Sequence, residues 1–273
     1  MTAYEQIKKH EEYKQLCMAS KKKPTATVPS GYHLWDTVQD ENGFFACIYQ
    51  KDNEIIIVYR SSDDINDWID SNKSMALGHM PAQAENALQV YDMVNKFCLE
   101  NNMKLTVIGF SLGGSLAEIV GAMRNAVAVT FNAYGVKNLL NPNIKYTNNK
   151  VTNYCCDEDI ITRINAENHV GMCFVVQSKN LSKRAHYIEN MGSLYEREEV
   201  YAPYLQQQYE IEERSQKEFE QYKKYGRLII HMPGMYSKDD QSGCTGSYPV
   251  SDYTRDDGTK VEGYIRTCYK HGK

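Results

Sequence analysis

The stretch Leu105-Thr-Val-Ile-Gly-Phe-Ser-Leu-Gly-Gly-Ser-Leu-Ala117 decides the fold. It begins with a short apolar run typical of a buried β-strand and continues into a segment, Leu112 to Asn125, whose pattern predicts a helix. The motif Gly109-x-Ser111-x-Gly113 lies at the junction. In a nucleophile elbow a serine stands on a sharp turn between strand and helix, where flanking glycines avoid collisions with both elements. We therefore expect Ser111 to be a catalytic nucleophile; a tight turn without catalytic function is the alternative.

Further strands and helices alternate on both sides of this motif. Gly43 to Tyr49 and Glu54 to Arg60 are β-prone runs that predict a hairpin. Pro81 to Asn101 has apolar residues at spacings of three and four, which predicts a helix packed on a core. Additional strands are expected at 127–131, 150–155 and 172–177. This alternation predicts an α/β domain with a mostly parallel sheet flanked by helices.

Length and composition exclude several classes of protein. The chain has 273 residues, of which 42% are hydrophobic and 24% charged, so it is not wholly disordered. Its longest clean apolar run, Ile55 to Tyr59, is far shorter than the roughly 20 residues of a membrane-spanning helix. The net charge of −4 gives no electrostatic reason to expect nucleic-acid binding.

The N-terminal segment and the cysteines bear on the compartment. Thr2 and Glu5 fit a capping box, which predicts a first amphipathic helix. The first 20 residues lack the apolar core of a secretory signal peptide. We therefore expect a cytoplasmic protein, with export by a specialised secretion system as the alternative. The eight cysteines form no CxxC pair or zinc-like spacing, so we expect reduced thiols and no metal; a disulfide framework is the alternative.

A serine nucleophile needs a base and an acid, which in this arrangement follow it in the order acid, then histidine. The histidines after Ser111 are His169, His186, His231 and His271. The candidate acids, which follow the next predicted strand, are Asp157, Glu158 and Asp159. Spacing alone does not choose among these residues.

Over residues 40–195 the sequence resembles the class 3 (fungal-type) lipase family of the α/β-hydrolase superfamily, as a distant member. Four motifs in the family's order carry the resemblance: Ile55-Ile-Ile-Val-Tyr-Arg-Ser-Ser62, Ile65-Asn-Asp-Trp-Ile69, the elbow, and Asp159-Ile-Ile-Thr-Arg-Ile164 followed by His169-Val-Gly171. The resemblance implies an α/β-hydrolase fold and a serine carboxylic-ester hydrolase that needs no cofactor.

The same resemblance assigns roles to individual residues. It selects Asp159 as the triad acid, with Asp157 as the fallback, and makes His169 structural. His186 is then the expected base. Ser62 and the backbone N–H of Leu112 are the expected oxyanion donors. The segment with Ile65, Trp68 and Ile69 matches the start of the family's lid, and a plain surface helix is the alternative.

The sequence departs from the family pattern at three places. Ser61 stands where the family usually has Gly, and Thr162 stands where it has Pro. Thr130-Phe-Asn-Ala-Tyr134 replaces the usual Gly-x-Pro after the strand. None of these changes removes an expected catalytic group.

The composition changes near Tyr195. We expect a hydrolase domain over 1–195 and an appendage over 196–273, with a polar helix from about Pro203 and a small β-hairpin. The hairpin is predicted by Asp257-Gly258, which separates two similar segments, 250–255 and 261–266. The appendage is a candidate partner-binding module, and a flexible polar tail is the alternative.

These observations predict a lipase or phospholipase that cleaves acyl esters through a Ser111–Asp159–His186 triad and an acyl-enzyme intermediate. Its expected partners are an acyl-ester substrate and, transiently, a membrane surface. Two other functions stay open: a non-lipid serine esterase or thioesterase, and a non-catalytic hydrolase-fold binding protein.

Overall fold

The computed structural model describes residues 2–21, 28–41, 43–61, 75, 79–179, 185–200, 217, 246–250, 253–254, 260–261 and 264–268. The chain divides into two compact units, Met1–Glu213 and Arg214–Lys273. Each unit is described by itself.

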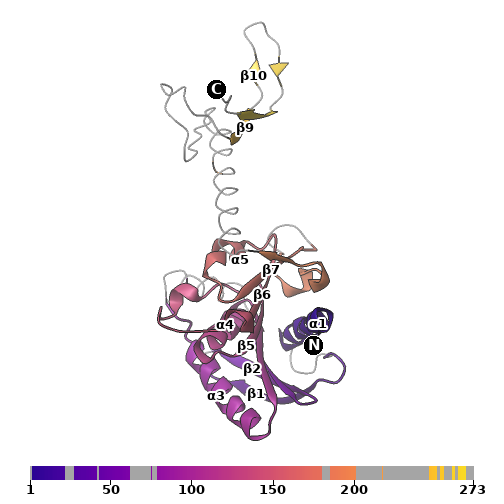
Figure 1. Ribbon diagram of the computed structural model, residues 1–273, viewed down its shortest axis with the longest axis vertical. Coiled ribbons are helices and arrows are strands. Elements are labelled where there is room, and N and C mark those ends of the chain that lie inside the picture. The colour runs from indigo at the N-terminus through magenta and orange to yellow at the C-terminus, as the bar shows by residue number, and fades with distance from the viewer. Residues whose placement is uncertain are drawn as a thin grey trace. The chain divides into compact units, whose positions relative to one another are not determined.

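The first unit is built on a sheet whose eight described strands follow one another in chain order, from β1 to β8 (Figure 1). Strands β3 to β7 are parallel, whereas β1, β2 and β8 pair antiparallel at the two sides. The strands are β1 (His33–Gln39), β2 (Phe45–Lys51), β3 (Glu54–Tyr59), β4 (Lys104–Phe110), β5 (Val127–Phe131), β6 (Val151–Cys156), β7 (Met172–Val176) and β8 (Glu198–Val200). The mostly parallel sheet and the β2–β3 hairpin are as predicted.

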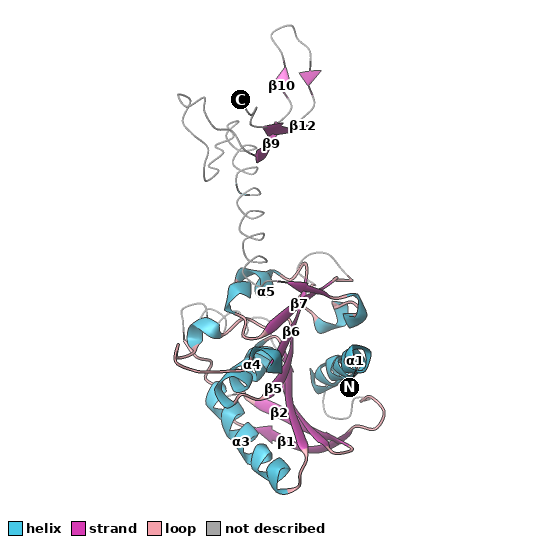
Figure 2. Ribbon diagram, in the orientation of Figure 1, coloured by secondary structure: helices cyan, strands magenta, loops and turns pink. Residues whose placement is uncertain are grey.

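Helices cover both faces of this sheet (Figure 2). The crossover helices α3 (Ala84–Glu100) and α4 (Leu112–Arg124) lie together on one face, and α1 (Ala3–Lys21) lies on the other. Right-handed crossovers between strands in sequential order place their helices on the same face, so the opposite face must be covered by another segment. The remaining helices are α5 (Ile160–Ile164) and the 3-10 turns η1 (Lys137–Leu139), η2 (Asn148–Lys150), η3 (Ala166–Asn168), η4 (Ile188–Asn190) and η5 (Leu194–Glu196).

Strand β3 shows how the two faces are buried. Ile55, Ile57 and Tyr59 belong to the core beneath α3 and α4. Ile56 and Val58 belong to the second core, beneath α1 and the turns after residue 185. Side chains alternate between the faces of a strand, so a strand covered on both faces has an uninterrupted apolar sequence.

Helix α1 begins with the predicted capping box. The backbone N–H of Thr2 donates to Glu5 at 2.7 Å, and the N–H of Glu5 donates to the Thr2 hydroxyl at 3.2 Å. With 19 residues, α1 is about 28 Å long. The seven-residue strand β4 is about 23 Å long. The helix can therefore extend from one edge of the parallel strands to the other.

The second unit contains two pairs of short antiparallel strands. β10 (Tyr253–Thr254) pairs with β11 (Lys260–Val261), and β9 (Gly246–Val250) pairs with β12 (Tyr264–Cys268). The inner pair flanks the predicted turn at 257–258, which lies outside the described residues, as does nearly all of the polar helix expected from Pro203. The sheet of the first unit extends past the expected domain boundary at residue 195, because β8 pairs with β7.

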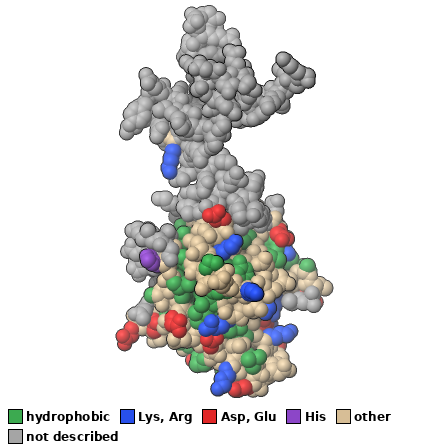
Figure 3. Space-filling model, turned by 60° about the vertical axis from the view of Figure 1, so that its left-hand side comes forward, with side chains coloured by type: hydrophobic (Ala, Val, Ile, Leu, Met, Phe, Trp, Pro, Cys, Tyr) green, Lys and Arg blue, Asp and Glu red, His purple; other side chains and the backbone are tan. Residues whose placement is uncertain are grey.

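Two properties of the surface and of the helices bear on function. Figure 3 shows acidic and basic side chains interspersed over one face of the described surface. No helix in the described part of the chain is both long and apolar enough to cross a membrane.

Candidate active site

Ser111 stands on the turn between β4 and α4. Its backbone has φ 54° and ψ −125°, and its N–H donates to the carbonyl of Phe131 at 3.0 Å. The chain can turn this sharply only where neighbouring side chains are absent. A Cβ at Gly109 would overlap the carbonyl of Gly113, and a Cβ at Gly113 would overlap the carbonyl of Tyr59. The predicted elbow geometry is therefore present at Ser111.

The structure brings Ser111, His186 and Asp159 into one hydrogen-bonded chain. His186 Nε2 lies 2.9 Å from Ser111 Oγ, and His186 Nδ1 lies 2.9 Å from Asp159 Oδ2. Ser111 and Asp159 are buried, and the His186 side chain keeps 16% of its surface exposed. With Nδ1–H donating to the carboxylate, Nε2 can accept the serine proton. These are the three residues predicted from the sequence.

Asp159 is held by two further donors. Its Oδ1 accepts a hydrogen bond from the backbone N–H of Ile161 at 3.1 Å, which caps the N-terminus of α5. Its Oδ2 accepts a hydrogen bond from the Thr162 hydroxyl at 2.6 Å. Three donors thus meet one carboxylate, which suits a group that only accepts when ionised. Thr162, where the lipase family has proline, is a direct partner of the expected acid.

Asn132, at the carboxyl end of β5, is a residue whose role sequence reasoning missed. Its Nδ2 donates to the carbonyls of His186 at 2.9 Å and Ala185 at 3.2 Å, and its Oδ1 accepts from the N–H of Cys156 at 2.8 Å. Asn132 is fully buried and has φ 45°, a conformation that Asn tolerates better than most residues. It therefore ties the backbone at His186 to the ends of β5 and β6. The only hint in the sequence is that this asparagine lies in the segment that departs from Gly-x-Pro.

The expected oxyanion donors differ in how far they can be placed. Leu112 is the first residue of α4, so its N–H has no hydrogen-bond partner within the helix. Ser62 lies outside the described residues, as do Ile65, Trp68 and Ile69 of the expected lid.

The alternative acids and bases have other surroundings. Asp157 accepts hydrogen bonds from the N–H groups of Ser178 at 2.8 Å and Glu158 at 2.9 Å. His169 Nδ1 lies 3.0 Å from the buried carboxylate of Glu118, a residue of α4. His231 and His271 lie outside the described residues. Among the described alternatives, none of these contacts leads to Ser111.

The described cysteines offer no competing nucleophile. Cys17, Cys47, Cys98, Cys155, Cys156 and Cys173 are buried and free. Burial raises the pKa of Cys156 to about 12 and that of Cys155 well above its ordinary value. A thiol is nucleophilic as the thiolate, so these groups are unreactive. No group of three or more His, Cys, Asp or Glu side chains that could hold a metal ion occurs in the described part of the chain.

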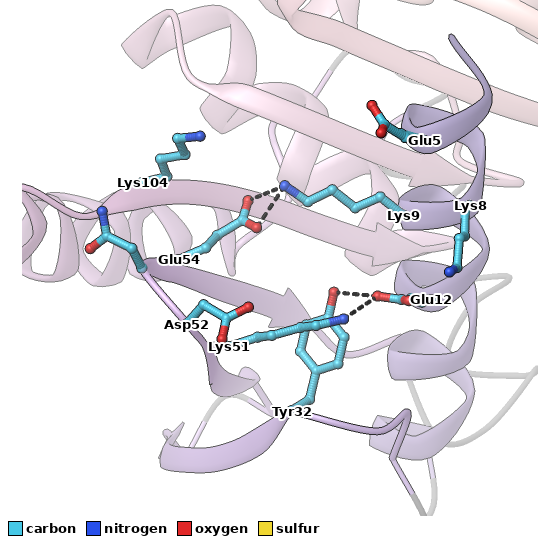
Figure 4. A pocket seen from close by; sticks show the side chains of 10 residues that line it. Glu5, Lys8, Lys9, Glu12, Tyr32, Lys51, Asp52, Glu54 and Lys104 are labelled. Atoms are coloured by element: carbon cyan, nitrogen blue, oxygen red, sulfur yellow. Dashed lines mark hydrogen bonds and ion pairs between the residues drawn. The ribbon is translucent and has the colours of Figure 1, made fainter. Parts of the chain in front are cut away.

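A hollow of about 410 Å³ lies at the opposite edge of the parallel strands, between α1 and the β2–β3 hairpin (Figure 4). Its charged groups are already paired across it. Lys9 lies 2.6 Å from Glu54, and Lys51 lies 2.7 Å from Glu12, which also accepts from the Tyr32 hydroxyl at 3.1 Å. These pairs fasten α1 to the sheet, and the hollow lacks a nucleophile among its lining residues.

Known proteins with similar sequences or structures are lipases and phospholipases. An extracellular phospholipase A1 of Serratia liquefaciens is 34% identical over 95 residues, so the match covers 35% of this chain and only 28% of that relative. The Rhizomucor miehei lipase in its propeptide complex has a TM-score of 0.45 and 18% identity, over 64% of this chain and 70% of that chain. The Lip2 lipase of Yarrowia lipolytica has a TM-score of 0.47 and 13% identity, over 70% and 84%.

A family model described as a Tle-like phospholipase domain matches residues 2–207, which include α1, the whole eight-stranded sheet and all three residues of the hydrogen-bonded chain. The chain therefore belongs to the family of Tle-like phospholipase domains.

Proposed function

We propose that the chain is a serine hydrolase that cleaves the carboxylic esters of lipids, with Ser111 as nucleophile, His186 as general base and Asp159 as the acid that orients it. The observation that carries the proposal is the chain of two 2.9 Å contacts from Asp159 through His186 to Ser111. A serine on a strained elbow, a histidine within reach of its hydroxyl and a buried carboxylate behind the histidine form the arrangement that acyl transfer requires.

In the proposed reaction, Ser111 Oγ attacks the ester carbonyl while His186 Nε2 takes its proton. Negative charge develops on the carbonyl oxygen, where the N–H of Leu112 and a group of Ser62 are the proposed donors. His186 then gives its proton to the leaving alcohol, and an acyl-serine remains. Water, deprotonated by His186, releases the acid. Asp159 keeps the imidazole in the required tautomer and stabilises its charged form.

A lipid substrate is favoured by the family and by one relative. The family model describes a phospholipase domain, and the Serratia relative is named a phospholipase A1. The apolar residues Ile65, Trp68 and Ile69 are proposed to begin a lid that contacts the membrane surface. A soluble ester or thioester as substrate, and a binding protein without activity, are the outcomes that an experiment must distinguish from lipid hydrolysis.

The test uses a fluorophosphonate probe, which reacts covalently with activated serines. The wild-type protein is expected to be labelled, and Ser111→Ala is expected to remain unlabelled while it unfolds at the wild-type temperature. Ser115→Ala is the matched control, because Ser115 is also buried on α4 but its hydroxyl donates to the carbonyl of Tyr134 at 2.8 Å. Absence of labelling in folded wild-type protein would refute the enzyme proposal.

The substrate class is then tested with esters of increasing acyl length on mono-, di- and phosphoglycerides. Hydrolysis of long-chain lipids supports the lipase proposal, and activity restricted to short soluble esters contradicts it. The role of residues 196–273 in binding a partner or in delivery is also a proposal. Deletion of 231–273 is expected to leave esterase activity intact and to change where the protein is found.

A further inference from the structure

The C-terminal end of α1 brings a cation next to the His186 ring. Lys21, the last residue of the helix, has its Nζ 4.9 Å from the centre of the Phe110 ring and 5.4 Å from that of Tyr187. The Phe110 ring in turn lies 5.2 Å from the imidazole of His186. Because Phe110 directly precedes Ser111 and Tyr187 directly follows His186, the ammonium group lies at the rim of the proposed active site.

The position of Lys21 follows from how α1 is anchored. At the amino edge of the strands, Lys9 lies 2.6 Å from Glu54, and the hydroxyl of Tyr13 donates to the same carboxylate at 2.9 Å. From Lys9 to Lys21 the helix advances about 18 Å, which is close to the length of β4 from Lys104 to Phe110 at about 20 Å. The ion pairs at one edge thus fix the height of Lys21 at the other.

The charge of Lys21 is only loosely engaged. Its anionic partner is Glu189, at 3.3 Å, and the Glu189 side chain is 44% exposed to solvent. Ion pairs with such exposed carboxylates contribute little to stability. A substrate anion can therefore displace Glu189 at small cost. Attraction of the ammonium group to the faces of two aromatic rings keeps Lys21 in place meanwhile.

The side on which Lys21 lies indicates which part of a substrate it would meet. In the proposed mechanism His186 donates its proton to the leaving alcohol, so the alcohol portion of the ester must lie on the His186 side of Ser111. In a phosphoglyceride that alcohol carries the phosphate, whereas the acyl chain stays on Ser111.

We propose that Lys21 is a specificity-determining residue that binds an anionic phosphate on the leaving-alcohol side of the substrate. This inference rests on the proposed esterase function and goes beyond it by naming the residue that distinguishes a phosphoglyceride from a neutral glyceride. The interaction is one between an ammonium point charge and phosphate oxygens, which lysine forms readily.

The experiment measures kcat/KM for phosphatidic acid and for diacylglycerol with the same acyl chains, both in neutral detergent micelles. These substrates share the ester and differ in the phosphate. Lys21→Gln is expected to lower the ratio of the two kcat/KM values about five- to tenfold, the scale of one lost charge-assisted hydrogen bond. Lys21→Arg is expected to retain most of the ratio, and Glu189→Gln, which removes the competing carboxylate, is expected to raise it.

Lys8→Gln is the matched control, because it removes the same charge from an exposed position near the other end of α1. A ratio in Lys21→Gln that equals that of Lys8→Gln would overturn the inference. This includes the case in which Lys21→Gln slows both substrates alike, which would indicate that Lys21 only supports Phe110 and His186. Hydrolysis of diacylglycerol but not of phosphatidic acid by the wild type would refute the role of Lys21 and leave the esterase proposal intact. Hydrolysis of neither substrate, with no fluorophosphonate labelling, would refute both.

Discussion

The substitution Asn132→Asp tests whether the backbone at His186 is held in place by a single buried side chain. Aspartate has the shape of asparagine and tolerates the positive φ at this position. One carboxylate oxygen can still accept from the N–H of Cys156. The other replaces the amide Nδ2, which donates to the carbonyls of Ala185 at 3.2 Å and His186 at 2.9 Å. Two hydrogen bonds are lost, and like partial charges then face each other.

The expected cost has two parts. Each lost hydrogen bond removes about 1 kcal/mol, and a buried oxygen opposed to two carbonyls adds to this, so the free energy of unfolding should fall by about 2–4 kcal/mol. The 185–186 segment should also move away from Ser111. Since a displacement of about 1 Å at a reacting group can reduce a rate about 100-fold, we expect kcat to fall by about 10- to 100-fold.

The assay compares Asn132→Asp with Asn153→Asp, a control of the same chemistry. Asn153 is equally buried and its Nδ2 also donates to two backbone carbonyls, those of Val170 at 2.8 Å and Met172 at 3.2 Å. Both variants should lose similar stability in urea. Only Asn132→Asp should show the large loss in the rate of fluorophosphonate labelling and in kcat on a short soluble ester. Equal rates in the two folded variants would refute the reasoning.

Three further substitutions test the acid, the elbow and the buried surface beneath α1. Thr162→Val removes the hydroxyl that donates to Asp159 at 2.6 Å, and kcat on a short ester should fall roughly tenfold; an unchanged kcat would contradict this role. Gly113→Ala places a Cβ against the carbonyl of Tyr59, so it should destabilise the fold by about 3 kcal/mol or more in thermal unfolding, and a neutral effect would refute the steric argument. Burial lowers the pKa of His10 from 6.5 to about 4, so between these pH values the unfolded chain binds a proton that the folded chain does not, and stability should fall by about 1.4 kcal/mol per pH unit as the pH decreases. His10→Gln should flatten this slope by one proton in urea unfolding at pH 5–7, and an unaltered slope would refute the assignment.

The elements nearest to Ser111 could be predicted because their patterns are local. An apolar strand, a glycine-flanked serine and a helix of small residues are contiguous in the chain, and the structure confirms β4 and α4. The hairpin of β2 and β3 and the capping box of α1 are local in the same sense. The sequence also predicted the three residues that the hydrogen-bonded chain joins, although their catalytic roles stay predictions. There, the resemblance to a family selected Asp159 and His186 where spacing alone did not.

The supports of the site could not be predicted, because they join residues that are distant in the chain. Asn132 contacts the backbone of a residue 54 positions away. The sequence marked this segment and Thr162 only as departures from the family pattern. In the structure, both departures replace residues without side-chain hydrogen bonding by residues whose side chains hold His186 and Asp159 in place. The two positions are thus parts of one polar solution to the same positioning problem.

The role of α1 follows from the handedness of the fold. Strands in sequential order with right-handed crossovers leave one face of the sheet without helices, and on this face the rings of Phe110 and Phe131 require cover. A covering helix that spans the full height of the sheet must end at the edge where parallel strands deliver their catalytic loops. Its last residue is then a neighbour of the triad, whatever that residue is. In this chain it is a lysine, so the segment that completes the core also determines the charge that a substrate meets beside His186.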